Sequence, residues 1–190
     1  VIQCTDKYEV RQYLNEKGLG RCLNTLLGVW DRPAEIVWSD LPEQFAMKCT
    51  HGCGYNILCK SKADLDIGTA SRQLEEWLAR KYGDFLAEPH YNKIKPRIIC
   101  ETYLGEQLVN YKFFCFHGEP KFMYVVQGDG TEKRMTCLDM NQRPLPYKQH
   151  FLPVIETQGL LDGFEEMVQI CFSLSRPFPF VRVDLYQARG

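Results

Sequence analysis

Residues 48–56 read KCTHGCGYN, and three of them are potential metal ligands. Cys49, His51 and Cys53 lie close together, and Cys59 follows shortly after them. Structural zinc sites usually combine two such ligands with two more that come about a dozen or more residues later. The other cysteines are isolated from one another and embedded in apolar runs. Zinc therefore stays an alternative interpretation of this stretch.

The same stretch has the composition of a phosphate-binding loop. Lys48 is in a predicted strand, where side-chain alternation turns it away from its apolar neighbours. Gly52 and Gly54 let the backbone approach a ligand closely, and consecutive N–H groups in such a turn form an anion-binding concavity. Asn56 opens the next predicted strand. The spacing is not that of a Walker A motif, so an ordinary glycine-containing hairpin loop remains the alternative.

A second stretch with chemical potential is FVRVDLY, residues 180–186. The period of two in a strand places Arg182 and Asp184 on one face, and Val181, Val183 and Leu185 on the other. Asp184 could hold Mg²⁺ while Arg182 neutralises phosphate charge. The alternative is an ion pair within the sheet on a solvent-exposed face.

A third stretch, ICETYLGEQLVNYKFF, reads as strand, short loop and strand. The first strand ends with Glu101, Thr102, Tyr103 and Leu104, whose backbone could pair with the edge of an adenine. In the second strand, Asn110 could reach ribose hydroxyls and Lys112 could face a cleft. An ordinary pair of connected strands explains the pattern equally well.

The elements that must position these residues alternate between helix and strand periodicity. We predict helices at residues 7–18, 66–82 and 163–175, and strands at 24–30, 45–49, 56–60, 97–104, 110–116, 120–126, 133–140 and 180–186. The strands on either side of the glycine-containing loop form a predicted hairpin. Because hairpins and helices are mixed along the chain, we expect the α+β class.

The composition excludes several kinds of protein. The formal net charge is −1 with acids and bases interspersed, which indicates no nucleic-acid binding. No apolar run approaches the roughly 18 residues of a membrane span. There are nine cysteines, an odd number that does not favour a disulfide framework. Most lie in apolar runs, which indicates reduced thiols in the core of a cytoplasmic protein. The chain starts at Val1 without Met, so we expect it to be an internal piece of a longer protein; its oligomeric state stays open.

Taken in order, these stretches resemble one known family. The blocks DKYEVRQYL, LLGVW, LPEQFAMKCTHGCGYN, IKPRIICETYL, YKFFCFHGEPKF and FPFVRVDLY resemble those of the TupA-like ATP-grasp family, which is associated with teichuronopeptide and other bacterial surface-polysaccharide synthesis. The resemblance runs from Asp6 to Tyr186. It implies one ATP-grasp domain over residues 1–190, built of two α+β subdomains with mainly antiparallel sheets that clasp a nucleotide. A smaller, lid-like subdomain would span about residues 26–96, and a larger one about 97–190.

The resemblance also implies roles for individual residues of the first subdomain and the hinge. Lys7 and Lys48 would be the two phosphate-contacting lysines, and residues 50–56 would fold over the triphosphate. Within that loop the expected contacts are Gly52, Gly54, Asn56 and His51, although His51 could equally be a plain loop histidine. Glu101, Thr102, Tyr103 and Leu104 would form the hinge, and their backbone would contact adenine.

In the larger subdomain the resemblance implies a ribose contact, a metal ligand and a charge stabiliser. Asn110 stands where the family commonly has an acid, so the ribose contact there is a departure from the pattern. Lys112 would face the nucleotide, Asp184 would bind Mg²⁺, and Arg182 would stabilise phosphate charge. The family's next strand carries a Glu that completes the metal site, and the sequence stops at Gly190 before it. We therefore expect a chain that binds nucleotide and is catalytically incomplete.

The implied activity is that of an ATP-dependent carboxylate ligase. ATP would convert an unidentified carboxylate into an acyl phosphate, and an amine or thiol acceptor, linked to a polysaccharide, would displace the phosphate. Lys48 and Arg182 would stabilise the transferring phosphoryl group. Two alternatives remain, namely a glycosyltransferase of the same pathways and a non-catalytic nucleotide-binding module. The expected element order does not favour the parallel, doubly wound sheets of nucleotide-sugar enzymes.

Overall fold

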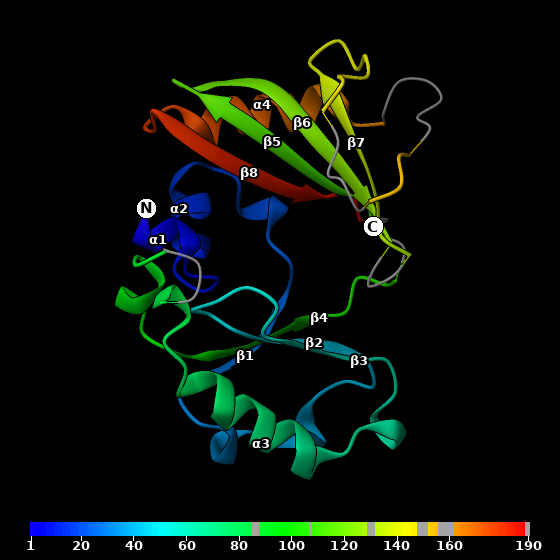
Figure 1. Ribbon diagram of the computed structural model, residues 1–190. Coiled ribbons are helices and arrows are strands. Elements are labelled where there is room, and N and C mark those ends of the chain that lie inside the picture. The colour runs from blue at the N-terminus through cyan, green and yellow to red at the C-terminus, as the bar shows by residue number, and fades with distance from the viewer. Residues whose placement is uncertain (85–87, 107, 129–131, 148–151, 156–161, 189–190) are drawn as a thin grey trace. The chain divides into compact units, whose positions relative to one another are not determined.

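The structure is a computed structural model of the chain. It describes residues 1–84, 88–106, 108–128, 132–147, 152–155 and 162–188. The chain divides into two units, Val1–Tyr103 and Leu104–Gly190 (Figure 1). The boundary lies inside the predicted hinge and later than the approximate position 96/97 suggested by the sequence.

The described residues of the first unit form three helices and four strands, separated by short 3₁₀ turns. They are α1 (Ile2–Thr5), α2 (Val10–Glu16), β1 (Leu26–Trp30), β2 (Phe45–Cys49), β3 (Asn56–Cys59), α3 (Ile67–Leu78) and β4 (Ile98–Thr102).

The helix predicted at residues 7–18 begins only at Val10. The Asp6 carboxylate accepts hydrogen bonds from the amides of Tyr8 at 2.8 Å and Glu9 at 3.2 Å, and these bonds hold a turn before the helix. Gly18, with φ of 70°, ends it as expected.

The strands of this unit form an antiparallel sheet in the order β1-β4-β2-β3. One face packs against α3 (Figure 1), and its core includes Phe45, Met47, Cys100 and Leu74, each fully buried. Alternation along β2 and β4 turns Lys48 and Glu101 to the opposite face. The predicted hairpin of β2 and β3 is present, with Lys48 paired to Asn56 nearest the loop.

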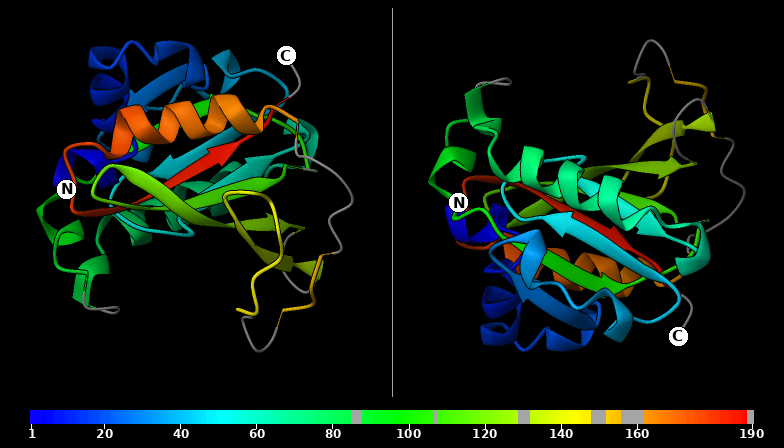
Figure 2. Two further views of the ribbon diagram at one scale, coloured as in Figure 1. Left: turned by 90° about the horizontal axis from the view of Figure 1, so that it is seen from above. Right: turned by 90° about the horizontal axis from the view of Figure 1, so that it is seen from below.

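In the second unit, the part of the chain that the structure describes forms one sheet and one long helix. Its elements are β5 (Asn110–Phe116), β6 (Glu119–Gln127), β7 (Arg134–Asp139), α4 (Phe164–Ser175) and β8 (Phe180–Tyr186). The sheet is antiparallel in the order β7-β6-β5-β8. Helix α4 lies across one face and contacts β5, β6 and β8 (Figure 2, left). Its apolar side, with Met167, Ile170 and Leu174, covers that face.

The predicted α+β class and the antiparallel pairing are confirmed. All nine cysteines are free thiols, and six of them are buried among apolar residues, as the sequence predicts. Within the described ranges, no helix has the length and apolarity to cross a membrane.

Candidate functional site

The loop between β2 and β3 needs glycine at both of its glycine positions. Gly54 has φ of +75°, a left-handed conformation that side chains disfavour. At Gly52 an added Cβ would come within 2.8 Å of ring atoms of Tyr55 and Tyr82. The backbone of this loop is therefore built into the unit and is more than a loose hairpin turn.

Lys7 is bonded to the backbone of this loop. Its ammonium donates hydrogen bonds to the carbonyl of Cys49, at 3.0 Å, and to that of Gly52. Burial lowers the pKa of Lys7, and the nearby charge of Lys48 lowers it further. The two predicted phosphate lysines thus lie near each other, with Lys7 bonded to the loop backbone. Its proposed phosphate contact stays a prediction.

His51 is 2% exposed and lies in the interior of the unit. Its Nε2 donates to the carbonyl of Trp77 at 3.0 Å, near the end of α3, and its ring lies 5.7 Å from that of Tyr55. Burial lowers the pKa of His51, so the imidazole is neutral in the folded state. This position favours the plain structural interpretation of His51 over a ligand contact.

The zinc alternative is not supported by the hairpin geometry. Cys49 lies at the loop end of β2, whereas Cys59 pairs with Phe45 at the far end of the hairpin. Cys53 is exposed, and its Sγ lies 3.3 Å from the hydroxyl of Tyr91. Among the residues that the structure describes, no three His, Cys, Asp or Glu side chains gather into a potential metal site.

Lys48 and Glu101 meet on the face of the first sheet that α3 leaves uncovered. The Lys48 ammonium lies 2.7 Å from Glu101 Oε2, and the Arg11 guanidinium lies 3.0 Å from Glu101 Oε1. Only 8% of Glu101 is exposed, whereas 30% of the Lys48 side chain is. The carboxylate is therefore held between two cations. The sequence indicated Lys48 and the position of Glu101, and missed Arg11.

A second ion-pair cluster holds the segment that carries Lys7. The Arg97 guanidinium lies 3.2 Å from the carboxylate of Asp6 and 2.6 Å from that of Glu9. Arg97 also holds Thr50 at the start of the loop: the Thr50 amide donates to the Arg97 carbonyl at 2.9 Å, and the Arg97 amide donates to Thr50 Oγ1 at 3.1 Å. The sequence did not reveal this cluster, because Arg97 is about 90 residues away from Asp6 and Glu9 in the chain.

The predicted hinge begins at the end of β4, where hydrogen bonds hold the backbone of Thr102. The Thr102 amide donates to the carbonyl of Thr25 at 3.0 Å, and the Asn24 side chain donates to the Thr102 carbonyl at 2.7 Å. Both backbone groups of Thr102 are thus used within the first unit. Glu101 likewise pairs with Leu26 and Ala46 within the sheet, so we propose Tyr103 and Leu104 as the remaining adenine contacts.

In the second unit, the register of β5 and β8 brings three predicted residues together. Lys112 pairs directly with Asp184, and their side chains meet at 3.0 Å. Arg182 Nε lies 2.6 Å from Asp184 Oδ1, and its Nη2 lies 2.9 Å from Oδ2. The alternation predicted for this strand is present, since Val183 is buried and Arg182 and Asp184 are exposed. The result is a charged patch of two cations around one carboxylate.

Asn110 lies on the same face as Lys112, two residues away along β5. Its amide nitrogen donates to the Tyr186 hydroxyl at 3.0 Å, and its Oδ1 is buried with no hydrogen-bond partner among the described residues. An acceptor in that state is suited to a hydroxyl donor, which is compatible with the proposed ribose contact.

Asp184 fits a magnesium site only in part. Mg²⁺ takes six oxygen ligands in near-octahedral geometry, with several supplied by water and nucleotide phosphates. Both oxygens of Asp184 accept hydrogen bonds from cations in this structure. The described residues therefore offer one carboxylate ligand that would first have to leave Lys112 and Arg182, and they do not form a complete metal site.

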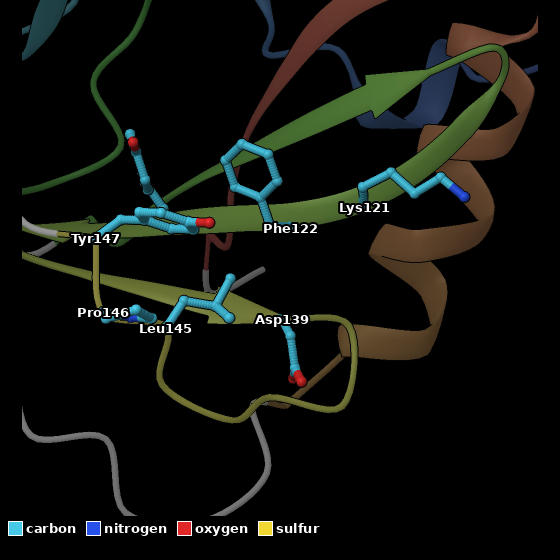
Figure 3. Close-up of a pocket in the computed structure, with 7 residues that line it drawn as sticks. Lys121, Phe122, Asp139, Leu145, Pro146 and Tyr147 are labelled. Atoms are coloured by element: carbon cyan, nitrogen blue, oxygen red, sulfur yellow. The ribbon is translucent and has the colours of Figure 1, made fainter.

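An open hollow of about 940 Å³ lies elsewhere in the second unit (Figure 3). Its lining residues come from β6, β7 and the segment after β7: Lys121, Phe122, Tyr124, Asp139, Leu145, Pro146 and Tyr147. Figure 3 shows the rings of Phe122 and Tyr147 beside each other, with 6.5 Å between their centroids. None of these residues is a predicted contact. Only the alternating Phe122 and Tyr124 could have indicated an aromatic face from the sequence.

Comparison with known proteins identifies the family of this chain. Among proteins with curated descriptions, none matches this sequence. Among solved structures, the L-amino acid ligase from Bacillus licheniformis is similar at 13% identity and a TM-score of 0.43, over 75% of this chain and 41% of the ligase. This chain thus spans less than half the length of that ligase. The family described as TupA-like ATPgrasp matches all of residues 1–190, so the chain belongs to the TupA-like ATP-grasp family.

Proposed function

We propose that this chain supplies the nucleotide-binding part of an ATP-dependent carboxylate ligase. One observation carries the proposal: Lys48 lies at the entrance of a glycine loop whose backbone Lys7 and Arg97 anchor. Such a loop presents N–H groups to phosphate oxygens, and the lysine adds a positive charge beside them. In the second unit, Lys112 and Arg182 are further proposed nucleotide contacts.

The proposed reaction has two displacements. A carboxylate oxygen of the substrate attacks the γ-phosphorus of ATP and ADP leaves, which produces an acyl phosphate. A nucleophilic acceptor then attacks the acyl carbon and releases inorganic phosphate. The protein's part is to position the reactants and to stabilise charge on the phosphoryl oxygens, which Lys48 and Arg182 would do. When bound, Mg²⁺ would neutralise further phosphate charge, with Asp184 as one ligand.

The loop and the strand-end backbone would supply binding and protection. Closure of residues 50–56 over the triphosphate would keep water from the acyl phosphate. The backbone of Tyr103 and Leu104 would hold adenine, and Asn110 would hold ribose. A place in bacterial surface-polysaccharide synthesis rests on the family's association alone, and the carboxylate and acceptor remain to be identified by substrate screening.

A nucleotide-binding module without turnover is the second candidate. It is favoured by one feature, namely that the Asp184 carboxylate is held by Lys112 and Arg182 instead of facing an open metal site. A sugar-transferring enzyme is less well supported, because both sheets are antiparallel and the doubly wound parallel sheet is lacking among the described strands.

Isothermal titration with a non-hydrolysable ATP analogue, with and without Mg²⁺, tests the proposal. We expect magnesium-dependent binding by the natural chain and a loss of at least about tenfold in affinity for Lys48→Met, since a charge-assisted contact to phosphate disappears. Lys95→Met is the matched control, because Lys95 forms an exposed ion pair with Asp31 at 2.8 Å. Binding of a nucleotide sugar in place of ATP, or equal binding by all three proteins, would refute the proposal.

ADP release in the presence of a panel of carboxylates and amines separates the two candidates. A ligase turns over ATP only when both substrates are present. A binding module holds ATP tightly and releases no ADP with any pair.

A further inference from the structure

Arg11 is a partly buried cation to which the proposed reaction assigns no role. It lies on α2, and 16% of its side chain is exposed. One arm of its guanidinium pairs with Glu101 Oε1 at 3.0 Å, and the other donates to the carbonyl of Asn24 at 2.8 Å. Asn24 in turn holds the carbonyl of Thr102 at 2.7 Å. Arg11 therefore contacts both Glu101, which pairs with Lys48, and Asn24, which holds the backbone of the hinge.

The charges of this cluster do not cancel. Glu101 brings one negative charge, while Arg11 and Lys48 each bring a positive one. Removing one partner of a buried pair is costly, because the other is left uncompensated. If Lys48 were the sole partner of Glu101, its movement to a phosphate would leave a bare carboxylate that is only 8% exposed. With Arg11 present, the carboxylate stays paired when Lys48 turns away.

We propose that Arg11 is a positioning residue for nucleotide binding: by sharing the Glu101 carboxylate, it frees the Lys48 ammonium to contact a phosphate. This inference rests on the proposed function. Arg11 itself does not touch the nucleotide; it acts through Glu101 and Lys48. A guanidinium suits this role, because its fork stays charged and can hold the Glu101 carboxylate after Lys48 has left it.

The test measures the affinities of ATP and of adenosine for four proteins: the natural chain, Arg11→Met, Glu101→Gln and the double variant. Calorimetry gives the ATP affinities and NMR titration gives the weaker adenosine affinities. We expect Arg11→Met to bind ATP about tenfold more weakly, a change that corresponds to about 1.4 kcal/mol. Its adenosine affinity should change less than about twofold, because no phosphate is involved.

The double variant is the decisive control. Without the carboxylate nothing sequesters Lys48, so Arg11→Met combined with Glu101→Gln should bind ATP about as well as the natural chain does. Such a coupling between neighbouring residues is what a double-mutant cycle measures. Arg11→Lys should fall between Arg11→Met and the natural chain, and it replaces Arg11→Met in the cycle if the latter does not fold.

Each remaining outcome overturns the inference. Equal ATP affinity for Arg11→Met and the natural chain would show that the shared carboxylate does not matter. Equal losses for ATP and adenosine would assign Arg11 to the structure of the hinge alone, as would a double variant that is no better than Arg11→Met. If the natural chain binds no ATP, the proposed function fails and the inference falls with it.

Discussion

Arg97 pairs with a carboxylate that is almost completely buried, so its removal should strongly destabilise the first unit. Its guanidinium pairs with Asp6 at 3.2 Å and with Glu9 at 2.6 Å, and it lies 4.6 Å from the centre of the Tyr8 ring. The side chain of Asp6 is 3% exposed, whereas that of Glu9 is 39% exposed. The pair with Asp6 therefore dominates, since water screens the pair with Glu9.

Replacing Arg97 by Met keeps much of the apolar volume and leaves the buried carboxylate of Asp6 without its cation. Breaking a buried pair in this way costs about 3–5 kcal/mol. The backbone amides of Tyr8 and Glu9 still donate to Asp6 Oδ1, and these two hydrogen bonds continue to stabilise the negative charge in the variant. We therefore expect a loss near the lower limit, about 3 kcal/mol in the free energy of unfolding.

Urea denaturation followed by tryptophan fluorescence isolates this effect. The three tryptophans of the chain, Trp30, Trp38 and Trp77, all belong to the first unit, so their signal reports on that unit. Arg32→Met is the matched control, because the Arg32 side chain is 79% exposed in its pair with Glu35. Its loss should be below about 1 kcal/mol.

Two results would refute the reasoning about this buried pair. One is an equal loss for Arg97→Met and Arg32→Met. The other concerns Asp6→Asn, which removes the charge but keeps an oxygen for the two amides. Combined with Arg97→Met it should recover part of the stability, and no recovery would mean that the unpaired charge was not the cause.

Three further predictions concern the loop and α3. Burial lowers the pKa of His51, so the unfolded chain takes up a proton below about pH 6.5 before the folded state does. The contribution of His51 to the free energy of unfolding should therefore be complete above that pH and decrease below it. In urea melts between about pH 5 and 7, His51→Gln should lose stability less steeply as the pH falls than the natural chain does. An equally steep loss in both proteins would contradict a lowered pKa of His51. Gly54→Ala should cost about 1–2 kcal/mol because φ is +75°, with a cost near zero as the contrary result. Asp66 caps α3 through the Thr69 amide at 3.1 Å, so Asp66→Ala should cost about 1 kcal/mol in thermal unfolding, and Asp66→Asn much less.

Local patterns in the sequence determined most of the elements and the faces they present. The alternation in FVRVDLY predicted that Arg182 and Asp184 share a face opposite Val183, and the structure has that arrangement. The glycines after Lys48 predicted a loop between two strands, which is the hairpin of β2 and β3. These predictions succeed because strand periodicity and turn conformation depend on residues close together in the chain.

The tertiary structure decided what the polar residues contact. Strand β4 inserts between β1 and β2, and this order alone brings Glu101 beside Lys48, with Arg11 reaching the same carboxylate from α2. Lys7 likewise proved to donate to the loop backbone, and His51 to lie in the interior. No local pattern carries this information, because the partner of a buried charge is set by sheet order and register, which bring together segments that are distant in sequence.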